Sequence, residues 1–458
     1  MDRILSKDIE KNEGKSATMF GWVAARRNHG KIIFIDLRDR WGITQVVFDD
    51  KTYAEASKLS QEDVIMVKGQ VKNRPEGLVN PKIVSGKVEV LANSVKVLAK
   101  SKTPPFDVSD TKNISEETRM KYRYLDLRSE RMKNNLKTRT EVIQFIREYL
   151  IAKDFLEIET PLLTKSTPEG ARDYLVPARL HPGKFYALPQ SPQQFKQLLM
   201  VSGLEKYFQI ARCLRDEDPR GDRQPEHTQM DLEMSFVEQK DVMQINEELV
   251  KKIIKDLFPD KKIQTDSFPT MTYAEAMSEY KTDRPDLRKD KNSKSELAFC
   301  WIIDFPFFKK NKEGQWTFTH NPFSDPMPED KAKLLKGEVE NIRTTQYDLV
   351  LNGMEIGGGS IRSHEIDILK KVFEILGYNQ EQISDRFGHM LEAFNYGVPP
   401  HGGIAWGLDR FITIMQNEPS IREVIAFPKT GDGRDLMMNA PSEVDEKQLN
   451  ELKIQIKK

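Results

Sequence analysis

The stretch YDLVLNGMEIGGGSIR (347–362) decides the fold of the larger part of this chain. Two apolar runs flank Asn-Gly at 352–353, a dipeptide typical of two-residue β-hairpin turns. The hairpin could bring the carboxylates of Asp348 and Glu355 to one Mg²⁺ ion. Three glycines allow close backbone approach to a ligand, and Arg362 offers a bidentate fork for a carboxylate. The alternative interpretation is a tight turn with surface charges.

Outward from this hairpin, strand-like and helix-like segments alternate irregularly. Strand-like runs lie at 206–214, 230–237 and 403–408, and helical spacing of apolar residues appears at 137–153, 192–201, 241–257 and 363–376. This mixture favours an α+β domain with a mainly antiparallel sheet flanked by helices. No G-x-G-x-x-G or P-loop motif opens a helix, so any ATP must be held by another device.

The first hundred residues have a different pattern. Five short strands separated by turn signals are predicted at 18–24, 31–37, 43–48, 63–71 and 87–98. Five such strands predict a small barrel. The oligonucleotide-binding (OB) barrel is one such five-stranded fold, and its exposed sheet face binds single-stranded bases. The barrel region carries 18 Lys and Arg against 13 Asp and Glu, a weak indication of a nucleic-acid partner.

Two further segments carry arginines in positions suited to nucleotide chemistry. CLRDEDPRGDRQPEHTQMDLEM (213–234) places Arg215 among acidic residues, where a fixed guanidinium can stabilise charge on a transferring phosphoryl group. GGIAWGLDRF (402–411) places Arg410 where a strand enters a helix, suited to lie over an adenine and reach a phosphate. The alternatives are a solvated charged hairpin and a helix-start Asp-Arg pair.

Together with FLEIETP (155–161), these segments occur in an order that resembles the three motifs of class II aminoacyl-tRNA synthetases. The resemblance implies a six-stranded antiparallel sheet flanked by helices, and a homodimer formed through the first motif. It also implies three parts: an anticodon-binding OB domain (1–100), a linker or hinge (101–130) and a class II catalytic domain (131–458).

The finer resemblance is to bacterial aspartyl-tRNA synthetases, on STPEGARDY (166–174), QSPQQFK (190–196) and GGGSIR (357–362). It implies ATP and Mg²⁺ as cofactors, and L-aspartate and tRNA(Asp) as partners. The implied aspartate site contains Glu169, Ser191, Gln193, Lys196, Asp231, His320 and Arg362. A short carboxylate side chain needs convergent cations, and a buried ammonium group needs a carboxylate, so these residue types suit aspartate.

The resemblance also assigns the nucleotide and metal sites. The implied catalytic residues are Arg215, Glu217 and Arg410, and the implied ATP site contains Arg215, Glu217, Gln224, His227, Glu355, Gly407, Asp409 and Arg410. Asp348 and Glu355 would hold Mg²⁺. His227 occupies the position of the family's aromatic residue that stacks on adenine.

In the barrel, Phe34 resembles the residue that stacks on an anticodon base. The predicted anticodon residues are Arg27, His29, Phe34, Gln45, Gly77 and Glu89, with simple core packing as the alternative for Phe34. His29 stands where enzymes strict for tRNA(Asp) tend to have leucine, and Arg74-Pro-Glu-Gly77 resembles the loop of relaxed enzymes. We therefore hypothesise that tRNA(Asn) is charged as well.

The sequence departs from the bacterial pattern in two places. The inserted domain of over a hundred residues between motifs 2 and 3 is reduced to a short charged remnant at 281–298, and Asn321 follows His320 where a second histidine is more familiar.

Alternative functions are an asparaginyl or lysyl sister enzyme and a catalytically silent synthetase-like protein that binds tRNA or regulates a partner. Lys196 and Arg362 disfavour the sister enzymes, and the presence of Arg215 and Arg410 disfavours the silent protein. No run of about 18 apolar residues exists and the N-terminus is charged, so we expect a cytoplasmic protein that is not inserted in a membrane.

Overall fold

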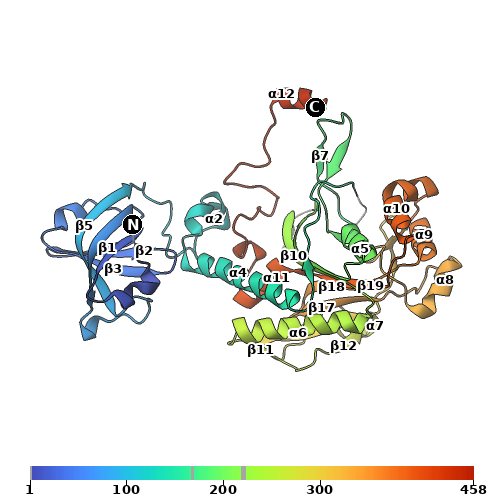
Figure 1. Cartoon of the computed structure of the whole chain (residues 1–458), viewed down its shortest axis with the longest axis horizontal. Coiled ribbons are helices and arrows are strands. Elements are labelled where there is room, and N and C mark those ends of the chain that lie inside the picture. The colour runs from blue at the N-terminus through green and yellow to red at the C-terminus, as the bar shows by residue number, and fades with distance from the viewer. Residues whose placement is uncertain (1–2, 167–169, 218–222, 458) are drawn as a thin grey trace. The chain divides into compact units, whose positions relative to one another are not determined.

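The computed structural model describes residues 3–166, 170–217 and 223–457. They form two compact units, residues 1–133 and residues 134–458, which are described separately (Figure 1). None of the described helices is long and apolar enough to cross a membrane.

The smaller unit is built on a closed five-stranded barrel, and each of its strands overlaps one of the five predicted ones. The strand order is β1-β2-β3-β5-β4, with bounds β1 (Ser16–His29), β2 (Ile32–Arg38), β3 (Ile43–Phe48), β4 (Val64–Asn73) and β5 (Val88–Ala99). Side chains alternate along β2, so Ile33 and Ile35 are fully buried in the barrel core while Phe34 is only half-buried on the other face. Phe34 is therefore absent from the core cluster, contrary to the core-packing alternative.

Short helical elements complete this unit. They are the 3₁₀ helices η1 (Ser6–Asn12) and η2 (Glu76–Leu78) and the helices α1 (Tyr53–Ala56), α2 (Glu116–Lys121) and α3 (Arg123–Asp126). Buried Asp126 accepts hydrogen bonds from Arg119 and Arg123, which fastens α2 to α3.

The larger unit contains an eight-stranded sheet. Its order is β12 (Thr270–Thr272), β14 (Phe299–Ile303), β17 (Gln346–Leu351), β18 (Met354–Arg362), β19 (His401–Gly407), β10 (Glu226–Ser235), β9 (Lys206–Leu214) and β6 (Leu156–Glu157). The six central strands pair antiparallel, as expected. The structure adds one short parallel strand at each edge, β12 and β6.

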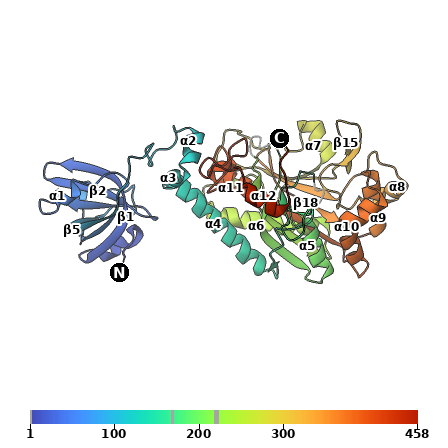
Figure 2. The same cartoon turned by 90° about the horizontal axis from the view of Figure 1, so that it is seen from above.

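Three helices cover the apolar face of this sheet: α4 (Glu130–Ile151), α6 (Gln239–Leu257) and α11 (Leu408–Gln416) (Figures 1 and 2). Alternation along β10 explains why one face is apolar. Met230 and Leu232 belong to the core, whereas Asp231 lines a cavity on the opposite face.

The remaining elements surround the sheet. The helices are α5 (Gln193–Val201), α7 (Tyr273–Tyr280), α8 (Lys331–Leu335), α9 (Ile366–Ile375), α10 (Gln380–Phe394) and α12 (Glu446–Leu452), with 3₁₀ helices η3 (Pro328–Asp330) and η4 (Ile421–Glu423). The short strands are β7 (Leu175–Pro177), β8 (Phe185–Ala187), β11 (Lys262–Ile263), β13 (Glu296–Leu297), β15 (Phe308–Lys310) and β16 (Trp316–Phe318). Figures 1 and 2 show α8, α9 and α10 side by side, joined by their own apolar clusters.

The hairpin predicted from 347–362 is strands β17 and β18. Asn352 and Gly353 both have positive φ, 51° and 82°, as a type I′ turn requires. The glycines that follow are needed because the strands lie close together: a Cβ at Gly357 would lie 2.7 Å from Cδ1 of Trp406.

Candidate active site

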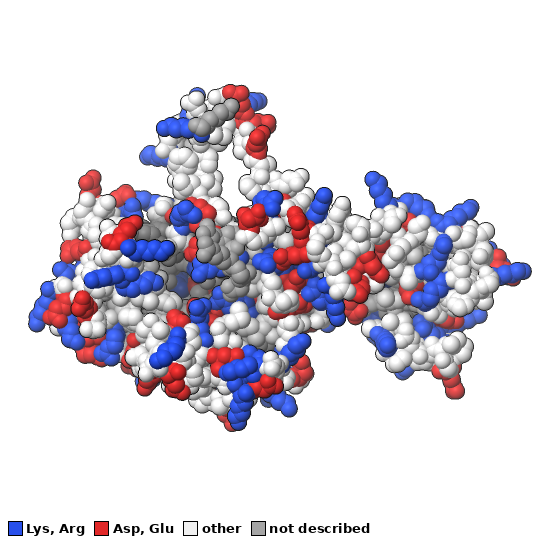
Figure 3. Space-filling model, turned by 180° about the vertical axis from the view of Figure 1, so that it is seen from behind, with Lys and Arg blue, Asp and Glu red and all other residues white. Residues whose placement is uncertain are grey.

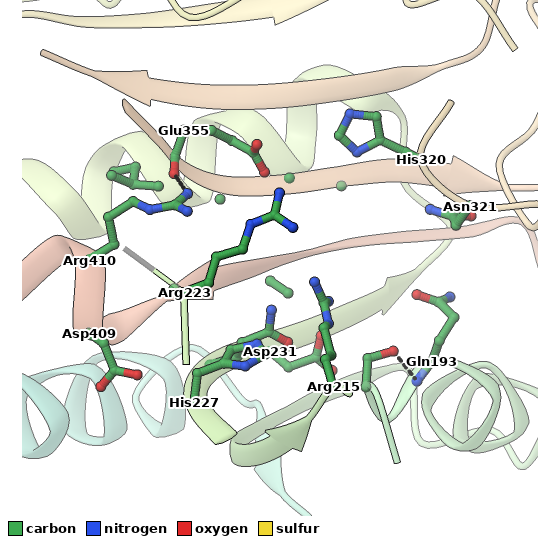
Figure 4. A pocket seen from close by; sticks show the side chains of 18 of the residues that line it. Gln193, Arg215, Arg223, His227, Asp231, His320, Asn321, Glu355, Asp409 and Arg410 are labelled. Carbon is green, nitrogen blue, oxygen red and sulfur yellow. Dashed lines mark hydrogen bonds between the residues drawn. The ribbon is translucent and has the colours of Figure 1, made fainter. Parts of the chain in front are cut away.

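A cavity of about 380 Å³ opens on the polar face of the sheet and gathers most of the predicted residues. Its walls come from β10, β17, β18, β19 and α5, from the segment between β9 and β10, and from the start of α11 (Figure 4). The predicted residues that line it are Ser191, Gln193, Lys196, Arg215, Glu217, Gln224, His227, Asp231, His320, Glu355, Arg362, Gly407, Asp409 and Arg410. Glu169 lies outside the described residues.

A buried cluster of two cations and two carboxylates forms the floor of one end of this cavity. The Nζ atom of Lys196 donates to Oδ1 of Asp231 at 2.6 Å and lies 3.2 Å from Oε2 of Glu233. Arg362 donates from Nε and Nη2 to the two Glu233 oxygens at 2.9 and 3.2 Å. All four side chains are at most 2% exposed, so their charges are compensated within the cluster rather than by water.

The pairing sets the ionisation of the carboxylates. Burial by itself would raise the pKa of Glu233, but Arg362 and Lys196 outweigh it and lower this pKa to about 2. Burial dominates at Asp231 and raises its pKa, although Lys196 opposes the shift.

The other oxygen of Asp231, Oδ2, is buried and accepts no hydrogen bond from any described residue. Burial and the nearby Asp231 carboxylate raise the pKa of the Tyr207 hydroxyl, which donates to Oε1 of Gln209 at 2.9 Å. A buried carboxylate oxygen without a donor is costly, so this atom is suited to accept a ligand's ammonium group.

Positive side chains also line the cavity beyond the buried cluster. Arg215 and Arg223 point into the cavity, and Arg410 donates to the backbone oxygen of Glu355 (Figure 4). Arg223 also pairs with Glu217 at 2.7 Å. This concentration of guanidinium groups suits a polyphosphate.

His227 lies among these cations as a neutral ring. Burial lowers its pKa, and Arg215, Arg410 and Arg212 lower it further, to about 3. A neutral imidazole presents an uncharged aromatic face, which is compatible with stacking on a base.

Two predicted ATP residues have their polar atoms engaged by the protein itself. The amide of Gln224 accepts from Lys429 N at 2.7 Å and donates to Lys429 O at 3.0 Å, which fastens the C-terminal segment to the hairpin. Asp409 points away from the cavity, where its oxygens accept from Arg139 at 2.5 Å and from Thr228 N at 3.0 Å (Figure 4). Both residues thus hold backbone elements of the cavity wall.

Asp348 and Glu355 both approach Gly358 on the polar face of the sheet. A Cβ at Gly358 would lie 2.9 Å from Oδ1 of Asp348 and 3.5 Å from Oε1 of Glu355. Burial raises the pKa of Asp348 and the charge of Glu355 adds to the shift, although His320 opposes it, and the result is about 7. A cation bound near both carboxylates would stabilise their charged forms and lower the pKa of Asp348.

The donor set fits Mg²⁺ bound together with a substrate. The described residues contain no cluster of three or more His, Cys, Asp or Glu able to hold a metal by themselves. Mg²⁺ commonly binds one or two carboxylates and completes its shell with waters and substrate phosphates.

The departure at Asn321 has a structural role. Its Oδ1 accepts from Phe323 N at 3.0 Å and from Ser324 Oγ at 3.4 Å, which closes a turn beside the cavity. His320, one residue earlier, lines the cavity with Nε2 3.5 Å from Oδ2 of Asp348.

Sequence reasoning missed three charged residues of this cavity. Arg223 and Arg284 line it, and Glu233 holds both cations of the floor. Period-two alternation in MDLEM could have indicated Glu233, because it shares a strand face with Asp231.

In the barrel, cross-strand pairing gathers the predicted anticodon residues on the outer face. Phe34 is paired with Arg27, and its ring lies 5.8 Å from that of His29 in an edge-to-face arrangement. Asp36, two residues along, is paired with Gln45, whose amide donates to Glu89 at 2.8 Å. Arg27 forms two bonds to Asp36, at 2.7 and 2.8 Å. Gly77 lies in η2, and no described contact joins it to this face.

Comparison with known proteins decides the family. A family model described as tRNA synthetases class II (D, K and N) matches residues 115–431, and one described as OB-fold nucleic acid binding domain matches residues 17–98. The chain belongs to the class II tRNA synthetases.

Relatives of this synthetase match nearly its whole length. It is 43% identical to the aspartate–tRNA(Asp/Asn) ligase of Rubrobacter xylanophilus, over 97% of this chain and 95% of the relative. It is 42% identical to the ligase of the same name from Caldanaerobacter subterraneus subsp. tengcongensis, over 97% and 96%.

Solved structures share the fold. Asparaginyl-tRNA synthetase of Pyrococcus horikoshii, complexed with asparaginyl-adenylate, has a TM-score of 0.76 at 22% identity, covering 94% of this chain and 98% of that one. Aspartyl-tRNA synthetase of Entamoeba histolytica has a TM-score of 0.71 at 21% identity, covering 93% and 91%.

The reduced insertion agrees with the alignment. The match to the Rubrobacter ligase runs over 572 positions although this synthetase has 458 residues, so more than 100 positions of the relative have no counterpart. Here the chain passes from α7 to β14 through residues 281–298, which contain only the two-residue strand β13. Arg284 of this segment reaches the cavity wall.

The buried charge cluster at the cavity floor predicts that loss of one carboxylate lowers stability. Glu233→Gln leaves two buried cations with one carboxylate, and we expect the free energy of unfolding to fall by about 3–5 kcal/mol in urea denaturation at pH 7. Glu141→Gln is the matched control, because Glu141 forms an exposed pair with Lys137, and should cost less than about 1 kcal/mol.

Comparison of the wild type with Glu233→Gln also tests the sign of the pKa shift. The pKa of Glu233 is lowered from 4.5 to about 2 by folding, so its stabilisation is present above pH 4.5 and lost as the pH falls toward 2. The advantage of the wild type over Glu233→Gln should therefore shrink as the pH falls through this range. A constant difference would contradict the assignment.

Proposed function

We propose that this synthetase is an aspartate–tRNA ligase, which activates L-aspartate with ATP and transfers it to the 3′ end of tRNA(Asp) and also of tRNA(Asn). The observation that carries the proposal is the donor count at the cavity floor. Lys196 has three N–H groups and uses two on Asp231 and Glu233. Arg362 has five and uses four, on Glu233, Ser360 and Gly403. One donor therefore remains on each cation, which suits the two oxygens of a side-chain carboxylate.

The same count disfavours the sister substrates. Asparagine would present one acceptor and an NH₂ donor where two cationic N–H groups need acceptors. Lysine would bring a third cation to a floor whose acidic residue Glu233 is already held by two. The silent synthetase-like alternative is disfavoured because Arg215 and Arg410 are both present at the cavity.

In the proposed reaction the α-carboxylate of aspartate attacks the α-phosphorus of ATP, and the bond to the bridging oxygen breaks to release pyrophosphate. Arg215 and Arg410 stabilise charge on the phosphates, Glu217 and Gln224 shape the nucleotide pocket, and His227 stacks on the adenine. Asp348 and Glu355 would hold Mg²⁺, which supplies charge neutralisation when bound. A terminal ribose hydroxyl of tRNA then attacks the aspartyl-adenylate, forming the ester and releasing AMP.

The amino acid is proposed to lie with its side chain toward Lys196 and Arg362 and its ammonium group toward Oδ2 of Asp231. Ser191, Gln193 and His320 line the same end of the cavity and complete its walls. Glu169 belongs by resemblance to a segment over the amino acid.

The barrel is proposed to bind the anticodon. The exposed side of Phe34 can stack on a base, and Arg27, Gln45 and Glu89 surround it with donors and acceptors. Lys and Arg side chains gather on the barrel surface in Figure 3, where they suit the tRNA backbone. The proposed site of action is the cytoplasm.

We also infer a homodimer through the first motif. Large apolar side chains stand exposed there: Ile151 (56%), Leu156 (49%), Leu162 (50%) and Leu163 (53%). Large apolar side chains left exposed in and around one motif are typical of an interface.

Amino-acid activation tests the proposal directly. In ATP–pyrophosphate exchange we expect aspartate to be used, and asparagine and lysine to have kcat/KM at least about 100-fold lower. Arg362→Lys, which removes the planar fork, should raise KM for aspartate about tenfold and leave KM for ATP within about twofold. Arg343→Lys, at a half-exposed arginine that pairs with Glu329, is the control. Exchange with asparagine as fast as with aspartate would refute the assignment.

Charging of transcripts tests the relaxed specificity. The wild type should aspartylate tRNA(Asp) and tRNA(Asn) at similar rates. His29→Leu should slow charging of tRNA(Asn) about tenfold and spare tRNA(Asp), because the ring that packs on Phe34 is lost. If the wild type did not detectably charge tRNA(Asn), this part of the proposal would be wrong.

Sedimentation velocity tests the dimer. The double variant Leu162→Asp, Leu163→Asp should sediment as a monomer, since each protomer would place two carboxylates in the proposed apolar interface. Leu335→Asp, at a leucine of α8 that is 48% exposed, should leave the wild-type dimer unchanged. A monomeric wild type would disprove the inference.

A further inference from the structure

A row of buried hydrogen bonds leads from the cavity wall to the start of β19. Nε2 of Gln193 donates to Oε1 of Gln197 at 3.0 Å, one helical turn along α5. Nε2 of Gln197 lies 3.2 Å from Nε2 of His401, whose Nδ1 lies 2.8 Å from Pro399 O. Gln197 and His401 are completely buried and Gln193 is 8% exposed.

One atom fixes the direction of every bond in this row. A carbonyl oxygen only accepts, so Nδ1 of His401 must carry the hydrogen that meets Pro399 O. Burial disfavours the charged ring and lowers the pKa of His401, with Glu233 opposing the shift, and in the neutral ring that burial favours the second nitrogen carries no hydrogen. Its Nε2 is then an acceptor, and Gln197 must turn its NH₂ group toward it. The remaining oxygen of Gln197 can only accept, so Gln193 must donate to it.

The consequence appears at the cavity. With its NH₂ group held by Gln197, Gln193 presents its amide oxygen to the cavity, and Figure 4 shows this oxygen on the cavity side of the side chain. No described residue donates a hydrogen bond to this oxygen. A preorganised acceptor at this end of the cavity suits a ligand's ammonium group.

We propose that His401 and Gln197 are positioning residues that hold the amide of Gln193 with its oxygen toward the cavity, so that it accepts from the α-ammonium group of the amino acid. This rests on the proposed function, and it adds two residues that touch neither substrate. Without an acceptor at position 401, the Gln197 amide can reverse. Gln193 can then reverse as well, so that its NH₂ group faces the ligand's ammonium group in place of its oxygen.

A packing role for His401 would make a different prediction. Its ring lies edge-on to Phe394 at 6.2 Å, so an aromatic replacement keeps this contact while removing both ring nitrogens. Gln197→Met keeps the side-chain length but can no longer accept a hydrogen bond from Gln193. Gln197→Glu still offers an oxygen to the NH₂ group of Gln193.

The experiment compares two non-reactive sulfamate analogues of aspartyl-adenylate by calorimetric titration. One carries the α-ammonium group, and the other is the succinyl analogue, which has CH₂ in its place. For His401→Phe and Gln197→Met we expect the ammonium analogue to bind about tenfold more weakly and the succinyl analogue within about twofold of wild type. Gln197→Glu should keep the wild-type preference within about threefold.

The succinyl analogue reports whether the cavity of each variant is intact. Equal weakening of both analogues, or no weakening of the ammonium analogue, would overturn the positioning role. So would loss of the preference in Gln197→Glu. If the wild-type protein bound neither analogue, the proposed function would fail first, and the inference that rests on it would fall with it.

Discussion

The site of this synthetase depends on one buried carboxylate, that of Glu233. It holds Lys196 of α5 and Arg362 of β18 against β10, three segments far apart in the sequence. Two cations brought this close repel one another in a medium of low dielectric unless an anion lies between them. The carboxylate therefore lets both cations stand at the cavity with one N–H each still available, and its low pKa keeps it ionised.

The antiparallel sheet makes this arrangement compatible with a stable fold. Residues alternate along each central strand, so the face toward α4, α6 and α11 is apolar while the other carries the charges. The glycines at 357–359 belong to the same constraint, because side chains there would collide with neighbours such as Trp406 and Asp348. The apolar core and the charged cavity therefore lie on opposite faces of the same sheet. Polar atoms that do not face the cavity, as in Gln224 and Asp409, hold backbone segments around it.

Much of this could be predicted from local patterns. The five barrel strands, the Asn352-Gly353 hairpin and the antiparallel sheet follow from alternation and turn chemistry, which act over a few residues. The edge strands β12 and β6 could not be predicted, because two or three residues carry no periodicity. The partners of Glu233 and the hydrogen bonds through Gln197 and His401 could not be predicted either. They join segments that are distant in sequence and meet only in the folded chain.

By itself the sequence determined the family, the barrel and the residue types of the cavity, because motif order, strand alternation and turn dipeptides are written along the chain. Only the tertiary structure decided which charges pair, which oxygen of Asp231 remains unsatisfied, and which way the amide of Gln193 faces. The physical reason is that charge pairing and hydrogen-bond direction depend on distances of a few ångströms between atoms of distant segments. The hydrogen on Nδ1 of His401 is fixed by Pro399, and it orients an amide at the cavity two side chains away.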